Sequence, residues 1–310
     1  MKISPILLDR LRSKSTLETH QHLCELLARS RKVYYSRFGD GDVYILMGKS
    51  QKNHRFVESL RNELVESVSI DDPLYLKAMQ VNSPEEKGMT KGLFQLWKYN
   101  NEHARFLLDL LPSSNPIVFE SAVFPSYFLS FKPVEMNDFL DRFVRPRKKL
   151  FIGSVPREVV ERIFGPIDHY VQTPRKNAYA RIDFWWPEVA RLADQVELVL
   201  PAVGMATRVV SKRLWKLGKE VHCLDLGSIV DAVSSFPSSR SWIRLKRHMA
   251  NQVLLPEFRD NSLSYRVHCF WRESMLRIRK IFYDIDPFSR VPFIRKARRY
   301  HPGGPGKNFD

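Results

Sequence analysis

Cysteine is scarce in this sequence, and long apolar runs are absent. The 310 residues include three cysteines, Cys24, Cys223 and Cys269, which lie far apart. None of them forms a Cys-x-x-Cys pair or a cysteine and histidine spacing typical of a metal site, so a reducing compartment is favoured. No segment approaches the roughly 18 apolar residues of a membrane-spanning helix, and residues 1–12 hold only a short apolar patch, too brief for a signal peptide. We therefore expect a cytoplasmic protein.

Acidic residues are fewer than basic ones. The sequence has 34 acidic and 50 basic residues, a formal net charge of +16 at pH 7. This predicts acidic partners such as nucleotides, phosphate-rich substrates, nucleic acid or an anionic membrane. Residues 238–310 contain 16 Lys and Arg against 6 Asp and Glu, so +10 of the excess lies there. For this basic segment the alternatives are a solvated charged face, a peripheral contact with an anionic membrane, and binding of part of a substrate.

Hydrophobic residues make up 44% of the chain, ample for the core of one large domain or two smaller ones. Apolar periodicity and turn residues predict strands at 32–38, 74–79, 117–119, 149–152, 196–200 and 221–224. Helices are predicted from a capping box at Ser15 and Glu18 to Leu27, and at 56–68, 90–111, 134–144, 156–164 and 205–217. Strands that alternate with helices predict an α/β fold, with a mostly parallel sheet covered on both faces.

The segment 37–42, Arg-Phe-Gly-Asp-Gly-Asp, follows directly on a predicted strand. We expect its glycines to let the backbone turn tightly enough for Asp40 and Asp42 to converge on one divalent cation. Carboxylate oxygens favour magnesium, manganese or calcium over zinc, and magnesium or manganese commonly binds substrate phosphates as well. The segment therefore indicates phosphate chemistry, and the alternative is an ordinary Asp-Gly turn without a metal.

Residues 201–208, Pro-Ala-Val-Gly-Met-Ala-Thr-Arg, join a predicted strand to a predicted helix. Free amides and the helix dipole at such a junction favour a phosphate, and Gly204 permits its close approach. The segment is neither a complete Gly-x-Gly-x-x-Gly motif nor a P-loop, which disfavours a dinucleotide or kinase site of the usual kind. The alternative is a tight turn with no ligand.

Residues 173–179, Thr-Pro-Arg-Lys-Asn-Ala-Tyr, place two cations, an amide and an aromatic ring before a predicted helix. Such a set suits a diphosphate and a nucleoside. The alternative is that Asn177 caps a helix whose aromatic residues belong to the core. In parallel sheets, ligands bind outside the carboxyl ends of the strands. Because Asp40, Asp42, Gly204 and Asp225 all follow predicted strands, we expect them to share one crevice.

In their order along the chain, these segments resemble the GT-D-type glycosyltransferases, a family whose hallmark is Arg-Phe-Gly-Asp-Gly-Glu. The resemblance covers roughly residues 30–230 and includes the Leu-Asp-Leu-Gly segment at 224–227. It implies a Rossmann-like fold and transfer of a sugar, typically from UDP-glucose, with the help of a metal. It further implies a GT-D-like domain, which we expect over residues 1–233. The change of composition beyond Ser234 predicts a basic helical extension at 234–300, and the Pro- and Gly-rich end predicts a disordered tail at 301–310.

The resemblance assigns roles to individual residues of this sequence. Asp40 and Asp42 would hold Mn²⁺ or Mg²⁺, with Asp42 in place of the family's usual Glu. The residues expected at the donor are Arg37, Gly39, Gly41, Arg175, Asn177, Tyr179, Gly204 and Thr207.

Donor cleavage requires that the diphosphate leaving group be neutralised, by the metal and by Arg37 or Arg175. The acceptor hydroxyl would be deprotonated by a carboxylate or by the donor itself, and the candidate carboxylates are Asp225 and Asp231. The chain departs from the family at Ser228, where the family commonly has His.

The sequence thus predicts a metal-dependent hexosyltransferase that uses a nucleotide-sugar, typically a UDP-sugar, and a glycan, glycoprotein or lipid-linked acceptor. Three alternatives remain open. A nucleic-acid-binding protein would explain the basic aromatic C-terminal region but leaves the Asp-Gly-Asp segment unexplained. A phosphatase with an Asp-x-Asp motif lacks the expected partner motif, and a catalytically inactive relative would act only as a binding module.

Overall fold

The computed structural model describes residues 11–50, 56–79, 117–227 and 229–230, all of which belong to one compact unit. The strands are β1 (Leu11–Ser13), β2 (Tyr34–Phe38), β3 (Tyr75–Met79), β4 (Ile117–Ser121), β5 (Lys149–Gly153), β6 (His169–Gln172), β7 (Leu198–Ala202) and β8 (His222–Leu224). The helices are α2 (Thr16–Arg29), α3 (Asp40–Leu46), α4 (Glu58–Val68), α7 (Phe124–Phe131), α8 (Pro133–Phe143), α9 (Arg157–Phe164), α10 (Ile182–Leu192) and α11 (Ala206–Lys216).

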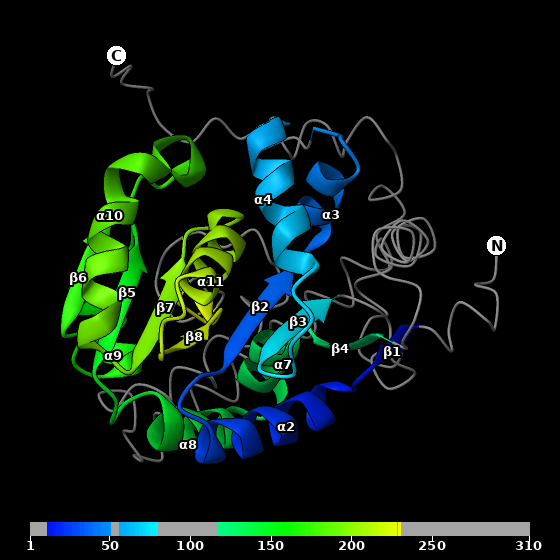
Figure 1. Cartoon of the computed structure of the whole chain (residues 1–310). Coiled ribbons are helices and arrows are strands. Elements are labelled where there is room, and N and C mark those ends of the chain that lie inside the picture. Colours follow the sequence, from blue (N-terminus) through cyan, green and yellow to red (C-terminus); the bar gives the residue numbers. More distant parts are fainter. Residues whose placement is uncertain (1–10, 51–55, 80–116, 228, 231–310) are drawn as a thin grey trace, which may run out of the picture. The chain divides into compact units, whose positions relative to one another are not determined.

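The described strands form one eight-stranded sheet in the order β1-β4-β3-β2-β8-β7-β5-β6. Every neighbouring pair is parallel. This confirms the predicted α/β fold with a parallel sheet (Figure 1).

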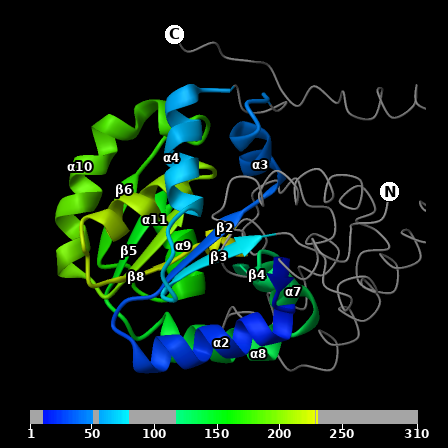
Figure 2. The same ribbon diagram turned by 45° about the vertical axis from the view of Figure 1, so that its right-hand side comes forward.

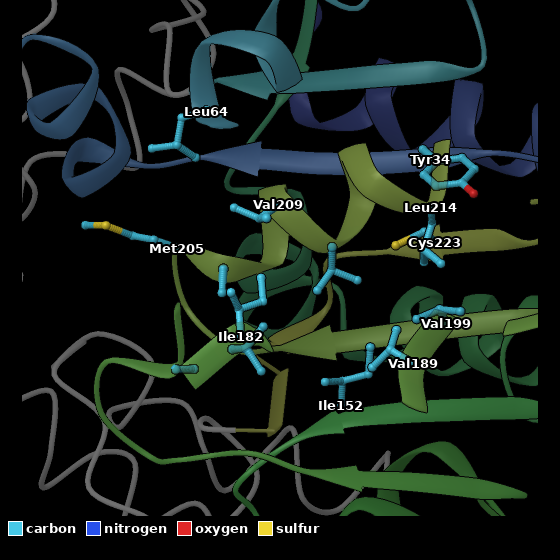
Figure 3. Packing of buried hydrophobic residues seen from close by; sticks show 14 of the residues in the cluster. Tyr34, Leu64, Ile152, Ile182, Val189, Val199, Met205, Val209, Leu214 and Cys223 are labelled. Atoms are coloured by element: carbon cyan, nitrogen blue, oxygen red, sulfur yellow. The ribbon is translucent and has the colours of Figure 1, made fainter. Parts of the chain in front are cut away.

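Two apolar layers cover the two faces of the sheet, because successive side chains of a strand point to opposite faces. On β2, Tyr34 belongs to the layer formed with α4, α10 and α11, whereas Tyr35 belongs to the layer formed with α2, α7, α8 and α9. Figure 3 shows Val209 and Leu214 of α11 in the first layer, with Leu64 of α4 among their neighbours. In the second layer, α2 and α8 run side by side (Figures 1 and 2).

The chain changes direction across the sheet between β2 and β8. From β2 the chain continues through β3 to β4 on one side, whereas β5 to β8 lie on the other side. The helices after β2 join the first apolar layer, and residues Leu226, Ile229 and Val230 after β8 join the second. A crevice is expected where the connections leave neighbouring strands toward opposite faces, so the carboxyl ends of β2 and β8 mark the expected ligand site.

The structure confirms most of the expected helices and strands, and the observed first and last residues lie within two positions of the predicted ones. The predicted strands correspond to β2, β3, β4, β5, β7 and β8, and the predicted helices to α2, α4, α8, α9 and α11. The strand β6 and the helix α7 were not predicted. The predicted helix at 90–111, the basic extension at 234–300 and the tail at 301–310 lie outside the described residues.

One prediction about the backbone is wrong. Residues 39–41 do not form a tight glycine turn: Gly39 is extended, with φ −87° and ψ −179°, and Asp40 begins α3. Among the described residues, the glycines with positive φ are Gly48, Gly165, Gly204 and Gly218. The apolar end of the segment decides the outcome, because Ile45 and Leu46 are fully buried in the first layer and hold residues 40–46 as a helix.

Among the described residues, the structure contains no helix that is both long enough and apolar enough to cross a membrane.

The capping box of α2 is formed as predicted. The Glu18 backbone N–H donates to Ser15 Oγ at 3.2 Å, and the Ser15 backbone N–H donates to Glu18 Oε2 at 2.7 Å. These two bonds satisfy donors that the first turn of a helix would otherwise leave unpaired.

Replacing Ser15 by Ala is expected to lower the free energy of unfolding by about 1 kcal/mol, because the amide of Glu18 loses its acceptor. The matched control is Ser30→Ala at the other end of α2, where the cap bond runs from the backbone N–H to Leu26 O. Urea unfolding followed by circular dichroism measures both variants. Equal losses in the two variants would contradict the assigned role of Ser15.

Candidate functional site

Four charged side chains meet at the carboxyl ends of β2 and β8. Arg37 Nη2 lies 2.8 Å from Asp225 Oδ1, Arg208 Nη2 lies 3.0 Å from Asp42 Oδ2, and Arg208 Nη1 lies 3.5 Å from Asp225 Oδ2. Each of the four residues is less than 10% exposed. We call these four residues the ion network; it contains two positive and two negative charges and is therefore neutral.

The fold places these side chains together from four separate segments. Arg37 is on β2, and Asp225 follows β8 directly, 188 residues further along the chain. The register of the parallel pairing between β2 and β8 brings these two residues to the same end of the sheet, and the Asp225 backbone N–H donates to Tyr35 O at 3.0 Å. Asp42 lies in the first turn of α3, and Arg208 lies in the first turn of α11. The predicted convergence of Asp42, Asp225 and the turn before α11 is thus confirmed.

Asp225 is held as a carboxylate. Its burial would by itself raise its pKa, but the charges of Arg37 and Arg208 and hydrogen bonds from Arg37 and the Gly227 amide outweigh burial, so the pKa is lowered. Burial of Arg37 likewise opposes its charge, yet the neighbouring Asp225 leaves its pKa raised. Arg37 and Asp225 therefore stay ionised at neutral pH.

Gly227 also brings the end of β8 close to the end of β7. A Cβ atom at residue 227 would lie 3.2 Å from Ala202 Cα, so a side chain there would push the two segments apart. The backbone N–H of the same glycine supplies one of the hydrogen bonds of Asp225.

Asp42 and Arg208 each bind backbone as well as each other. The Gly39 N–H donates to Asp42 Oδ2 at 2.8 Å, as a residue at the third helical position can do for the residue before the helix. Arg208 Nη1 donates to Gly204 O at 2.7 Å. The pair therefore links the segment after β2 to the turn after β7.

The turn at Gly204 is open to solvent. Gly204 is exposed, with φ +62°, and no atom lies within 4 Å of the place where its Cβ would be. Thr207 is almost fully buried below the turn, and its Oγ1 accepts a bond from the Val203 N–H at 3.3 Å. The predicted residues Gly204 and Thr207 thus have different roles: the first gives access to the turn, and the second shapes it from within.

Of the predicted metal pair, Asp42 suits a cation ligand poorly. Asp40 and Asp42 are the first and third residues of α3. Asp42 is 4% exposed, and its Oδ2 already accepts bonds from Arg208 and Gly39. The Asp40 side chain lies outside the described part of the structure. Among the described residues no group of three or more His, Cys, Asp or Glu side chains could hold a metal.

The segment 175–179 starts at the edge of the sheet, and the Tyr179 side chain forms a hydrogen bond with Ser59 of α4. It follows β6, the edge strand, which is three positions from β8, or about 14 Å at the usual strand spacing. Arg175 and Asn177 are exposed. Tyr179 is partly buried against the first apolar layer, and burial raises its pKa.

Asn177 does not cap a helix through its side chain. It adopts the left-handed conformation, with φ 53°, before a short 3₁₀ helix at Ala178–Arg181. The expectation that the following aromatic residues belong to the core is correct for Trp185, which is 4% exposed and donates from Nε1 to Ala178 O at 3.1 Å.

The remaining predicted residues are Gly39, Gly41 and Asp231. Gly39 supplies a backbone donor to Asp42, and Gly41 is buried within α3. Asp231 lies outside the described residues.

Sequence reasoning missed Arg208, although a signal was present. The first turn of a helix carries a partial positive charge, so a buried arginine there requires acidic partners nearby. The first turn of α11 contains no acidic residue. The partners of Arg208 therefore had to come from elsewhere in the chain, and the structure identifies them as Asp42 and Asp225.

Asp225→Asn is expected to lower the free energy of unfolding by about 3 kcal/mol at pH 7, because two buried guanidinium groups lose a charged partner. A lowered pKa stabilises the folded state fully above the ordinary Asp value of about 3.9 and progressively less as the pH falls through the folded value. The difference between the two proteins should therefore shrink below about pH 4. Chemical unfolding from pH 3 to 8 measures this. The control, Asp141→Asn in an exposed pair with Arg145, should cost less than about 1 kcal/mol.

Solved structures of other proteins share the fold of this chain. No family model and no curated protein matches the sequence at a significant level. A selenomethionine-substituted structure of "domain of unknown function 1792" is 19% identical, with a TM-score of 0.55 over 73% of this chain and 80% of that one.

Two further structures are similar. "A New Glycosyltransferase (DUF1792) from Streptococcus sanguinis" is 18% identical, with a TM-score of 0.55 over 72% of this chain and 82% of that one. A structure of the same domain, described as having "a distinct glycosyltransferase fold", is 20% identical, with a TM-score of 0.52 over 71% and 79% of the two chains. The chain therefore shares the fold of domain of unknown function 1792.

Proposed function

We propose that this chain is a glycosyltransferase that moves a hexose from a nucleotide-sugar, typically a UDP-sugar, to a glycan, glycoprotein or lipid-linked acceptor. One observation carries the proposal: the open turn at Gly204 is tied by Arg208 to Asp42 and Asp225, at the point of the sheet where a ligand is expected. The shared fold with structures described as glycosyltransferases supports it.

The donor diphosphate would lie over the turn at Gly204. Gly204 lets the ligand approach the backbone, and the amino end of α11, an 11-residue helix, favours negative charge through its dipole. The cations of the ion network are balanced by their own carboxylates, so we assign Arg37 to holding Asp225 rather than to binding phosphate directly. Arg175 is exposed and keeps its proposed part in neutralising the leaving group.

Asp225 suits a positioning role better than the role of base. A buried carboxylate with a lowered pKa and bonds to guanidinium groups takes up a proton poorly at neutral pH. The proposed base is therefore Asp231 or an oxygen of the donor itself.

A bound Mn²⁺ or Mg²⁺ stays a prediction. Asp42 suits a metal ligand poorly, because its Oδ2 already accepts bonds from Arg208 and from the Gly39 N–H. A peripheral contact with an anionic membrane through the basic C-terminal region also stays a prediction, and that region lies outside the described residues.

A catalytically inactive nucleotide-binding module is the second candidate. It is favoured by the engagement of Asp225 in the ion network, which leaves that carboxylate a weak base. Thermal shift and donor hydrolysis with a panel of nucleotide-sugars distinguish the two candidates, since an inactive module would bind a donor without hydrolysing it.

Gly204→Ala is expected to weaken binding of a UDP-sugar about tenfold or more, because a methyl group would occupy the surface on which the diphosphate lies. Gly218→Ala is the matched control: Gly218 also has a positive φ and open space around it, but it lies after the other end of α11. Isothermal calorimetry with UDP measures affinity, and thermal unfolding shows whether both variants carry the same backbone strain. Equal affinities in the two variants would remove the turn from the donor site.

The predicted metal is tested with Asp40→Asn. If Asp40 holds the cation, adding Mn²⁺ should strengthen UDP binding in the wild-type protein, and this gain should be lost in the variant. Asp183→Asn, an exposed carboxylate in the first turn of α10, serves as control. A variant that keeps the full gain from Mn²⁺ would show that Asp40 is no ligand.

A further inference from the structure

The side chain of Arg208 lies between two carboxylates that are far apart in the sequence, those of Asp42 and Asp225. Its Nη2 is 3.0 Å from Asp42 Oδ2, and its Nη1 is 3.5 Å from Asp225 Oδ2. The same Nη1 donates to Gly204 O at 2.7 Å. A planar guanidinium can serve several acceptors at once in a fixed geometry, which a lysine ammonium cannot reproduce.

Asp42 is needed where it lies. Arg208 is 8% exposed and sits in the first turn of α11, where the helix dipole disfavours a cation. Removing a carboxylate from such a site would leave a buried charge without compensation. Asp42 itself is fixed from the other side, because the Gly39 N–H donates to the same oxygen that faces Arg208.

These contacts form a continuous connection across the carboxyl edge of the sheet. The connection runs from the Gly39 amide through Asp42 and Arg208 to the Gly204 carbonyl. It joins the segment after β2 to the turn after β7, two strands that flank β8. The separation and orientation of these two segments therefore depend on the bond between Asp42 and Arg208.

We propose that Asp42 is a positioning residue that acts through Arg208 to set the conformation of the Gly204 turn, and that it is not a ligand of a divalent cation. The nature of the ligand at the turn, a nucleoside diphosphate, rests on the proposed function. The positioning itself does not, because it follows from the contacts of Asp42 and Arg208 alone.

The experiment compares Asp42→Asn, Arg208→Gln and the double variant. The control is Glu63→Gln, which breaks the ion pairs from α4 to Lys212 and Arg213 of α11 but touches neither the turn nor the ion network. Hydrogen exchange of the amides at 203–207 reports the turn without any ligand. Calorimetry with UDP, once in EDTA and once in Mn²⁺, measures how each substitution changes UDP affinity. Electron paramagnetic resonance measures the binding of Mn²⁺ alone.

The expected result is faster exchange at 203–207, by about tenfold, in Asp42→Asn and in Arg208→Gln, with no change in Glu63→Gln. The double variant should exchange no faster than Arg208→Gln alone, because Asp42 acts on the turn through Arg208. UDP affinity should fall by the same factor in EDTA and in Mn²⁺, and any binding of Mn²⁺ alone should survive in Asp42→Asn.

Two results would overturn the proposal. One is wild-type exchange at 203–207 in a folded Asp42→Asn protein; the other is loss of Mn²⁺ binding in that variant. Should Asp42→Asn fail to fold, the double variant, which leaves no unpaired charge at this pair, supplies the exchange data. If the wild-type protein does not bind UDP, the proposed function fails, while hydrogen exchange and Mn²⁺ binding still decide the role of Asp42.

Discussion

The ion pairs of Arg37, Arg208, Asp42 and Asp225 are the constraint on which the rest of the site depends. Burying four charges is costly, and the cost is offset only where the partners are correctly placed. Their placement requires the parallel pairing of β2 with β8, the helical start of α3 and the position of α11 over the sheet. The fold and the site are therefore determined by the same contacts.

The network also changes how the acidic segment is understood. Two acids one residue apart suggest a shared cation, yet here one of them pairs with an arginine of the same chain. A guanidinium that lies between Asp42 and Asp225 supplies positive charge at the crevice without an external ion. Charge neutrality within the network leaves the open turn at Gly204, rather than the arginines, as the surface offered to an anion.

Local features of the fold could be predicted because their causes are local. The capping box at Ser15 and Glu18 and the strand ends before Asp225 and Gly204 are set by residues a few positions away. The neighbourhood of Arg37 and Asp225 could not be predicted by this means, since it arises from strand order between segments 188 residues apart. The start of α3 was missed for a related reason: Gly and Asp are poor helix formers, and burial of Ile45 and Leu46 outweighs that preference.

The balance of charges within the network constrains how this site can change over time. Loss of a single arginine would leave a buried negative charge uncompensated, and loss of a single aspartate would leave a buried positive charge uncompensated. Single substitutions at these four positions are therefore expected to be destabilising, so an oppositely charged pair must change together. Positions 42 and 208 are accordingly expected to covary among relatives of this chain, as are positions 37 and 225.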